Sequence, residues 1–148
     1  SVAVFYGSMY GDTENAVNIL TSRLAEAGVK NIAVYDVSST HVSTMIAEVF
    51  RCSHLVFASA TYNGGIFSSM EHVLMDLKAH NLQNRTVALM ENGSWAPSCA
   101  RQMRALLEEM KSMEILEPVV TLKSALKNDS LAQLDALRDA LIASLMAE

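Results

Sequence analysis

The segment FYGSMYGDTENAV, residues 5–17, passes from an apolar, strand-like run into a helix-forming stretch through a turn of glycine and hydroxyl residues. A strand that leads directly into a helix is the first half of a β-α-β unit, which builds a parallel sheet. The N-terminus of a helix has unpaired N–H groups and a partial positive charge, so the turn is suited to an anion. The segment therefore predicts an α/β fold with an anion-binding loop after the first strand.

The same alternation of strand and helix continues to the end of the chain. The first helix is expected to stop before Gly28, and the last to begin with Asp129 or Ser130 as its N-cap. We therefore predict a five-stranded, doubly wound parallel sheet with helices on both faces, in one domain of residues 1–148. The predicted strands are 2–6, 31–35, 54–58, 86–90 and 118–122, and the other predicted helices are 41–50, 66–79 and 97–113.

The composition narrows the class of protein. The net charge is −5 and the basic residues are scattered, so neither a nucleic-acid partner nor an anionic membrane surface is expected. No apolar run is long enough to span a bilayer. Cys52 and Cys99 lie far apart and outside any metal-ligand spacing, which favours reduced thiols and a cytoplasmic protein. Because the chain enters strand-like sequence at once, at Val2, we expect a domain cut from a longer polypeptide.

Ligands of doubly wound sheets bind outside the carboxyl ends of the strands. The segments that follow the first, third and fourth predicted strands are GSMYGDT (7–13), SATYNGGIF (59–67) and ENGSWAPS (91–98). Each is rich in glycine, asparagine and hydroxyl residues. These three segments are therefore the candidate ligand site.

The first segment contains no lysine or arginine. A Walker loop needs a lysine to reach terminal phosphates, and a dinucleotide-binding loop needs the spacing GxGxxG; Gly7 and Gly11 fit neither pattern. Amides, hydroxyls and a helix end can satisfy a single phosphate monoester, which favours a mononucleotide-type cofactor. The alternative is an ordinary helix start with Asp12 or Thr13 as the N-cap.

The other two segments suggest contacts with a planar ring. Asn63 and Gly64 readily adopt positive φ, so the peptide between them can turn over at low cost; a plain tight turn is the alternative. Trp95, the only tryptophan, is placed to stack on a ring or, alternatively, to pack over the sheet edge. A flat heterocycle with one phosphate uses all three segments, and FMN is such a ligand.

SMYGDT (8–13) resembles the S/T-x-x-G-x-T phosphate loop of flavodoxins, and the similarity extends over essentially the whole chain. SATYNGGIFSSM (59–70) together with ENGSW (91–95) is most similar to the C-terminal flavodoxin-like domain of the flavodiiron proteins, or A-type flavoproteins. The resemblance implies FMN contacts from three groups of residues: Ser8, Met9, Tyr10, Gly11, Asp12 and Thr13 around the phosphate; Thr61, Tyr62, Asn63, Gly64 and Gly65 beside the isoalloxazine; and Asn92, Gly93, Ser94 and Trp95 near its pyrimidine side and over one ring face.

In that family, FMN relays electrons from a rubredoxin or an NADH-linked reductase to a di-iron centre that reduces O2 or NO. The sequence lacks the di-iron domain, and its four histidines have no HxHxD spacing, so no metal site is expected here. The resemblance thus implies an electron-transport flavoprotein module of an oxidoreductase, with the di-iron domain as its redox partner. Any homo-oligomer would form through that missing domain. A stand-alone short-chain flavodoxin is the alternative.

Three other functions fit the sequence less well. An FMN-dependent quinone reductase needs an open pocket over the flavin, where Trp95 is expected to act as a lid. A response-regulator receiver needs acidic residues where this sequence has Gly7-Ser8 and Ser59-Ala60. An interaction domain without a cofactor would leave the three segments unused. We expect no catalytic acid–base pair or nucleophile, because the acidic residues Glu14, Glu71, Asp76 and Glu91 are expected to be surface charges.

Overall fold

The computed structural model describes residues 1–7, 11–62, 65–92, 98–122 and 128–147. Helices and strands alternate along this part of the chain as the sequence predicts. The strands are β1 (Val2–Gly7), β2 (Ile32–Asp36), β3 (His54–Tyr62), β4 (Gly65–Ile66), β5 (Thr86–Asn92), β6 (Glu114–Ile115) and β7 (Val120–Leu122). The helices are α1 (Asp12–Glu26), α2 (Val42–Arg51), α3 (Ser68–Ala79), α4 (Cys99–Glu108) and α5 (Asn128–Met146).

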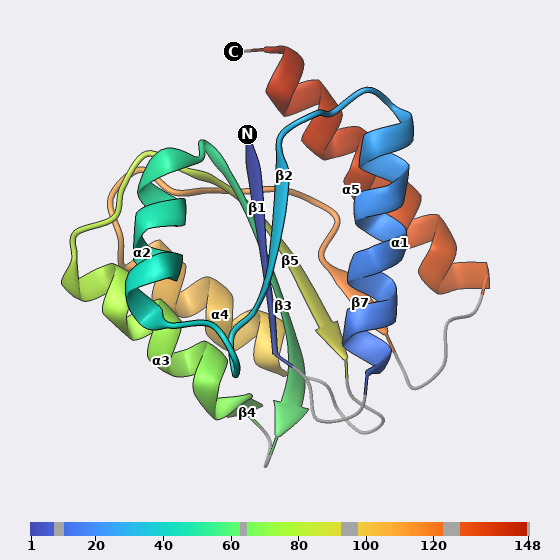
Figure 1. Cartoon of the computed structure of the whole chain (residues 1–148). Coiled ribbons are helices and arrows are strands. Elements are labelled where there is room, and N and C mark those ends of the chain that lie inside the picture. The colour runs from blue at the N-terminus through green and yellow to red at the C-terminus, as the bar shows by residue number, and fades with distance from the viewer. Residues whose placement is uncertain (8–10, 63–64, 93–97, 123–127, 148) are drawn as a thin grey trace.

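The sheet has the order β2-β1-β3-β5, with β6 and β7 both parallel to β5 along its outer side. The ladders of β1 with β2 and β3, and of β3 with β5, are parallel, whereas the short β4 pairs antiparallel with the end of β3. Helices α1 and α5 cover one face, and α2, α3 and α4 cover the other (Figure 1). The predicted doubly wound parallel sheet is confirmed.

Each face of the sheet has its own apolar core. Consecutive strand residues alternate between the two, so that Val4 and Val56 pack with α1 and α5, whereas Phe5 and Phe57 pack with α2, α3 and α4. The Phe5 and Phe57 rings stack at a centroid separation of 5.5 Å. Burial on both faces explains why the central residues of these strands are apolar at consecutive positions rather than at alternate ones.

The structure corrects several predicted boundaries. The fifth strand is divided into β6 and β7, with Pro118, which has no N–H to donate to a ladder, between them. Helix α3 begins at Ser68 rather than at 66, because Ile66 pairs with Thr61 in β4. Helix α4 ends at Glu108 rather than at 113, and α5 begins at Asn128, before its predicted N-cap.

Among the described residues, none of the helices is both long enough and apolar enough to cross a bilayer. Both cysteines, Cys52 and Cys99, are buried free thiols, as expected from their spacing.

Helix α1 ends at a glycine, as the sequence predicts. Gly28 has φ +101°, and its N–H donates to the Ala25 carbonyl while the Val29 N–H donates to the Leu24 carbonyl, each at 3.0 Å. This is the hydrogen-bond pattern of a Schellman motif, and Val29 packs in the same apolar cluster as Leu24. The turn carries the chain from α1 directly into β2.

Replacing Gly28 with alanine is expected to lower the free energy of unfolding by about 1–2 kcal/mol, because a Cβ is disfavoured at this positive φ. Gly28→Asn is the matched variant, since asparagine tolerates this conformation better, and its loss should be smaller. Urea denaturation of the two variants measures the difference. Equal stability of wild type and G28A would contradict this account of the turn.

Candidate functional site

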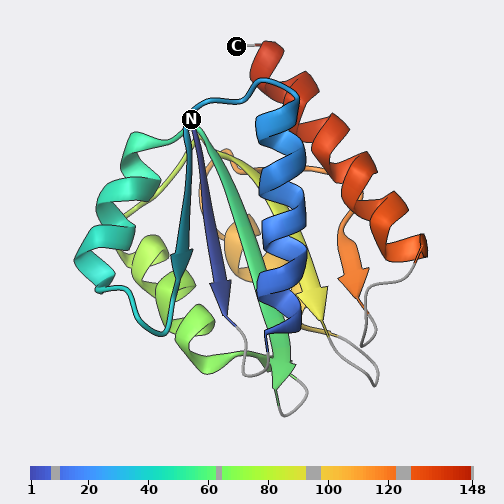
Figure 2. The ribbon, with the colours of Figure 1, turned by 45° about the vertical axis from the view of Figure 1, so that its right-hand side comes forward.

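The three strands that lead into the predicted ligand segments end at one edge of the sheet. Figure 2 shows β1, β3 and β5 (indigo, green and yellow) ending at the edge where α1 (blue) begins. In the sheet register, Gly7 at the end of β1 is paired with Ser59, and Ala60 with Asn92 at the end of β5. The strand order changes direction between β1 and β3, which is the place where doubly wound sheets bind ligands.

Part of the predicted site lies within the described residues. At this edge the structure brings together the α1 start, the end of β3 with β4, and the end of β5. The predicted contacts so placed are Gly11, Asp12, Thr13, Thr61, Tyr62, Gly65 and Asn92. The other predicted contacts, Ser8, Met9, Tyr10, Asn63, Gly64, Gly93, Ser94 and Trp95, lie outside the described residues.

Within the described residues, helix α1 begins without a side-chain cap hydrogen bond. Its N-cap is Gly11, with φ +77°, so the interpretation of Asp12 or Thr13 as the N-cap is wrong. Glycine has no side chain to accept a hydrogen bond from the first turn, and the N–H groups there lack the partner that a Ser or Asp N-cap would supply. The start of α1 therefore keeps the properties of an anion site.

The Thr13 hydroxyl lies in this first turn and is the main anomaly of the site. The residue is 1% exposed, and its Oγ1 has no hydrogen-bond partner among the residues that the structure describes. A buried hydroxyl without a partner destabilises the folded state, and such groups are rare in native proteins. A ligand oxygen at the N-terminus of α1 would satisfy it, so the residues present fit a phosphate group.

Gly7 joins the end of β1 to the opposite layer. A Cβ on this residue would lie 2.9 Å from Phe67 Cδ2 and 3.1 Å from Val37 Cγ2. Phe67 is the N-cap residue of α3. The absence of a side chain at Gly7 therefore lets the end of β1 approach the start of α3 closely, at the first residue of the first ligand segment.

Glu91 is not the surface charge that the sequence analysis expects, since it is only 9% exposed. Its Oε1 accepts a hydrogen bond from the Ala100 N–H at 3.1 Å, and its Oε2 accepts one from the Thr121 hydroxyl at 2.8 Å. The period of two along β5 could have revealed this position. Residues 87 and 89 face the core under α4, so residue 91 faces the same way.

The Cys99 thiol links Glu91 to the end of β3. Its Sγ accepts a hydrogen bond from the Thr61 hydroxyl at 3.4 Å. The Sγ atom lies 3.3 Å from the Ser59 carbonyl oxygen and 3.9 Å from Glu91 Oε1, which are the two acceptors within reach of the S–H. Burial raises the pKa of Cys99 to about 11; Glu91 adds to this shift and the hydrogen bond from Thr61 opposes it. The thiol therefore serves as a neutral packing and hydrogen-bonding group.

The histidines lie away from this edge or contribute to local structure. His41 Nδ1 accepts a hydrogen bond from the Ser43 N–H at the start of α2. His54 is buried between the hydroxyls of Ser53 and Ser144 at the opposite end of β3. No group of three or more potential metal ligands occurs within the described part of the chain.

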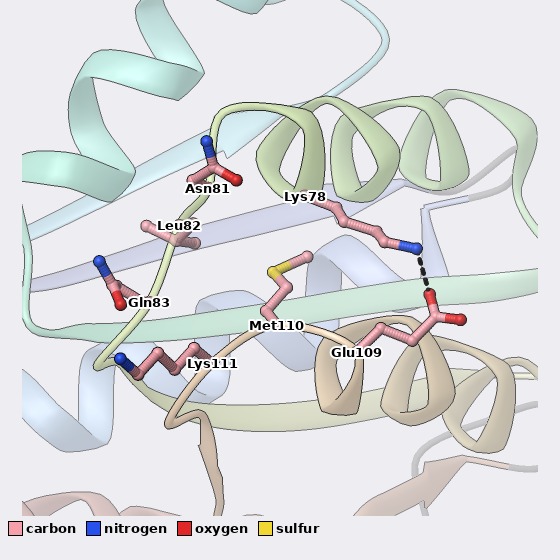
Figure 3. A pocket seen from close by; sticks show the side chains of 7 residues that line it. All are labelled: Lys78, Asn81, Leu82, Gln83, Glu109, Met110 and Lys111. Atoms are coloured by element: carbon pink, nitrogen blue, oxygen red, sulfur yellow. Dashed lines mark hydrogen bonds and ion pairs between the residues drawn. The ribbon is translucent and has the colours of Figure 1, made fainter.

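A surface cavity of about 440 Å³ lies elsewhere on the molecule, between the C-terminal ends of α3 and α4 (Figure 3). The Lys78 ammonium and the Glu109 carboxylate form an ion pair of 2.8 Å across its rim. Asn84 and Lys111, at the loops leading into β5 and β6, are hydrogen-bonded beside it. The cavity is thus at the amino ends of the strands and is not part of the candidate site.

Comparison with known families identifies the fold group. The family model described as Flavodoxin matches residues 4–136, which is most of the chain. The chain belongs to the flavodoxin family. Its flavodoxin fold is therefore that of an FMN-type electron-transfer protein. No curated protein matches the chain.

Solved structures share this flavodoxin fold over nearly the whole chain. The rubredoxin oxygen:oxidoreductase of Desulfovibrio gigas has a TM-score of 0.91 at 20% identity, over 99% of this chain and 36% of that one. The Flv1 flavodiiron core of Synechocystis sp. PCC6803 has a TM-score of 0.87 at 17% identity, with coverages of 99% and 36%. The flavodoxin of Streptococcus pneumoniae TIGR4 has a TM-score of 0.78 at 17% identity, with coverages of 97% and 98%. The chain thus spans about a third of the first two proteins and nearly all of the third.

Replacing Thr13 with valine is expected to leave the stability of the FMN-free domain unchanged or to raise it by up to about 1 kcal/mol, because the buried hydroxyl has no partner. Thr13→Ser is the matched control; it keeps the hydroxyl but loses a buried methyl group, and should lose about 1 kcal/mol. Urea denaturation of the cofactor-free proteins measures both. A loss above about 1 kcal/mol in T13V would show that the hydroxyl already has a partner.

Proposed function

We propose that this flavodoxin-family domain binds FMN at the carboxyl ends of β1, β3 and β5 and transfers electrons between a redox partner and an acceptor centre on another domain or protein. The observation that carries the proposal is the buried Thr13 hydroxyl, without a partner among the described residues, at the start of α1. It lies at the strand-order switch point, in the first turn of a helix whose N-cap residue is a glycine.

The proposed contacts of each part of FMN follow the three segments. The phosphate would be held at the start of α1 by residues 8–13, with the Thr13 hydroxyl and the first-turn N–H groups as donors. The isoalloxazine would lie between residues 61–65 after β3 and residues 92–95 after β5. The register pair Ala60 and Asn92 supports this arrangement, because it brings the ends of β3 and β5 side by side.

Bound FMN would supply reversible electron transfer, and the protein would supply position and electrostatics. Helix α1 would stabilise the phosphate charge through its dipole and its first-turn amides. A single phosphate needs no lysine in the loop, in agreement with the composition of residues 7–13. Ala58 and Met90, which precede this edge in β3 and β5, are fully buried in the apolar core that the sheet forms with α1 and α5.

We further propose that the acceptor is a di-iron O2- or NO-reducing centre carried on another domain, with a rubredoxin or an NADH-linked reductase as donor. The segments 59–70 and 91–95, together with the TM-score of 0.91 to the rubredoxin oxygen:oxidoreductase, support this assignment. A stand-alone flavodoxin is the second candidate, supported by the near-complete mutual coverage with the S. pneumoniae flavodoxin. Ligand-spaced histidines in the reading frame that flanks residues 1–148 would favour the first candidate.

Titration of FMN with the cofactor-free domain is expected to quench the flavin fluorescence with one FMN bound per chain. T13V should raise the Kd for FMN about tenfold or more, since it removes a hydrogen bond to a charged phosphate, whereas T13S should stay within about threefold. Riboflavin, which lacks the phosphate, should bind T13V and wild type with the same Kd. An equal loss of riboflavin and FMN affinity in T13V would argue against a phosphate at this hydroxyl.

The FMN-loaded domain is expected to be reduced rapidly by reduced rubredoxin in a stopped-flow experiment, with a rate proportional to rubredoxin concentration. NADH and a small quinone, without a reductase, should give no turnover, because an electron-transfer module needs no substrate pocket over the flavin. The absorbance of oxidised flavin follows the first reaction, and the absorbance of NADH follows the second. Steady NADH-dependent quinone reduction would instead favour the reductase function.

A further inference from the structure

Near the carboxyl ends of β3, β5 and β7 lies a layer of polar groups, in which Ser59 and Glu91 are buried and Thr121 is half-buried. Ser59, Glu91 and Thr121 are register partners across β3, β5 and β7, and hydrogen bonds connect the side chains of Glu91 and Thr121. Ser59 Oγ accepts a hydrogen bond from the Phe67 N–H at the start of α3. This layer lies between the ligand edge and the apolar core under α3 and α4. The buried carboxylate in it is that of Glu91, which neither packs as an apolar core residue nor is one of the proposed FMN contacts.

The Glu91 carboxylate connects the end of β5 to the start of α4. It stands directly before Asn92, the last residue of β5, and accepts the Ala100 N–H from the first turn of α4. A first-turn N–H has no carbonyl partner within its own helix, so the strand carboxylate caps this end of α4 from outside the helix. The end of β5 and the first turn of α4, which are separated by a few residues in the sequence, are therefore connected directly by the Glu91 side chain.

The same carboxylate is connected to the end of β3. Through Cys99 it reaches Thr61, whose hydroxyl donates to Sγ. On its other side it is fixed by Thr121, whose own N–H donates to Gln133 Oε1 on α5 at 2.9 Å. Glu91 thus connects β3, β5, β7 and α4 immediately below Thr61 and Asn92, two of the proposed FMN contacts.

Among the described residues, no basic group contacts the Glu91 carboxylate. The groups that touch its oxygens in the described part of the chain are a backbone N–H, a hydroxyl and a thiol, all neutral donors. A buried charge held by neutral donors acts on nearby groups more strongly than an exposed one, because water screens it little.

We propose that Glu91 is a positioning residue of the FMN site, which holds Asn92 and Thr61 beside the flavin through its hydrogen bonds and disfavours flavin reduction through its charge. The inference rests on the proposed FMN function. It concerns the chain's own support of the site and assigns Glu91 no direct contact with the cofactor.

Three variants and one control test the proposal. Glu91→Ala removes both the hydrogen bonds and the charge; Glu91→Gln keeps an oxygen that can accept the Ala100 N–H but removes the charge; Thr121→Val removes only the hydroxyl donor. Ser144→Ala is the control, because it removes a hydrogen bond to buried His54 at the opposite end of the sheet. For each protein, the unfolding midpoint without FMN, the Kd for FMN and the midpoint potential of the bound flavin are measured.

We expect E91A to raise the Kd for FMN about tenfold, T121V about threefold, and E91Q less than about threefold. E91Q should shift the potential upward, since reduction adds negative charge at a site from which a negative charge has been removed. S144A should lower the unfolding midpoint and leave both the Kd and the potential unchanged.

An unchanged Kd in T121V together with an unchanged potential in E91Q overturns the proposal, and neither result depends on E91A folding. A failure of wild type to bind FMN would instead reject the proposed function and this inference together. Wild-type binding with unaffected variants would reject the inference alone, so the two failures are distinguishable.

Discussion

The parallel pairing of β1 with β3, with both strands buried on both faces, is the constraint on which the rest of the structure depends. Val4, Phe5, Val56 and Phe57 occupy the centre of the sheet and are fully buried. Because packing uses every central position, polar groups are confined to the strand ends. Examples are the polar residues that follow the apolar runs of β3 and β5, namely Ser59, Thr61, Glu91 and Asn92. The chemistry therefore collects at one edge, where the strand order changes direction.

Much of the fold could be predicted from the sequence, because its central strands are buried on both sides and so appear as unbroken apolar runs. The errors occur where tertiary pairing overrides local pattern. Ile66 looks like the start of a helix but pairs with Thr61, and residues 114–115, outside the predicted strand, extend the ladder of β5. Boundaries of this kind depend on a neighbouring strand that no local window contains.

The strand ends that form the candidate site could also be predicted, but the hydrogen bonding of the polar groups in it could not. Gly and hydroxyl residues after β1 predict an anion loop, yet only the structure shows that Gly11 caps α1 and that the Thr13 hydroxyl is buried without a partner among the described residues. Glu91 shows the reverse case, since both of its oxygens are satisfied within the protein. A satisfied buried polar group is typical of structural support, and an unsatisfied one is typical of a ligand contact.

The division of the fifth strand around Pro118 has a consequence for how the domain meets other molecules. An open sheet edge presents unpaired N–H and C=O groups, which can recruit a strand from another chain. On the side of β6 and β7 the ladder consists of one stretch of two residues and one of three, and the residues between them, 116–119, include Pro118, which cannot donate. At the other edge, β2 is continuous over five residues, and the side chain of Val34 at its centre is 40% exposed. Strand addition, whether from a partner or in aggregation, is therefore directed to β2, on the far side of β1 from β3 and β5.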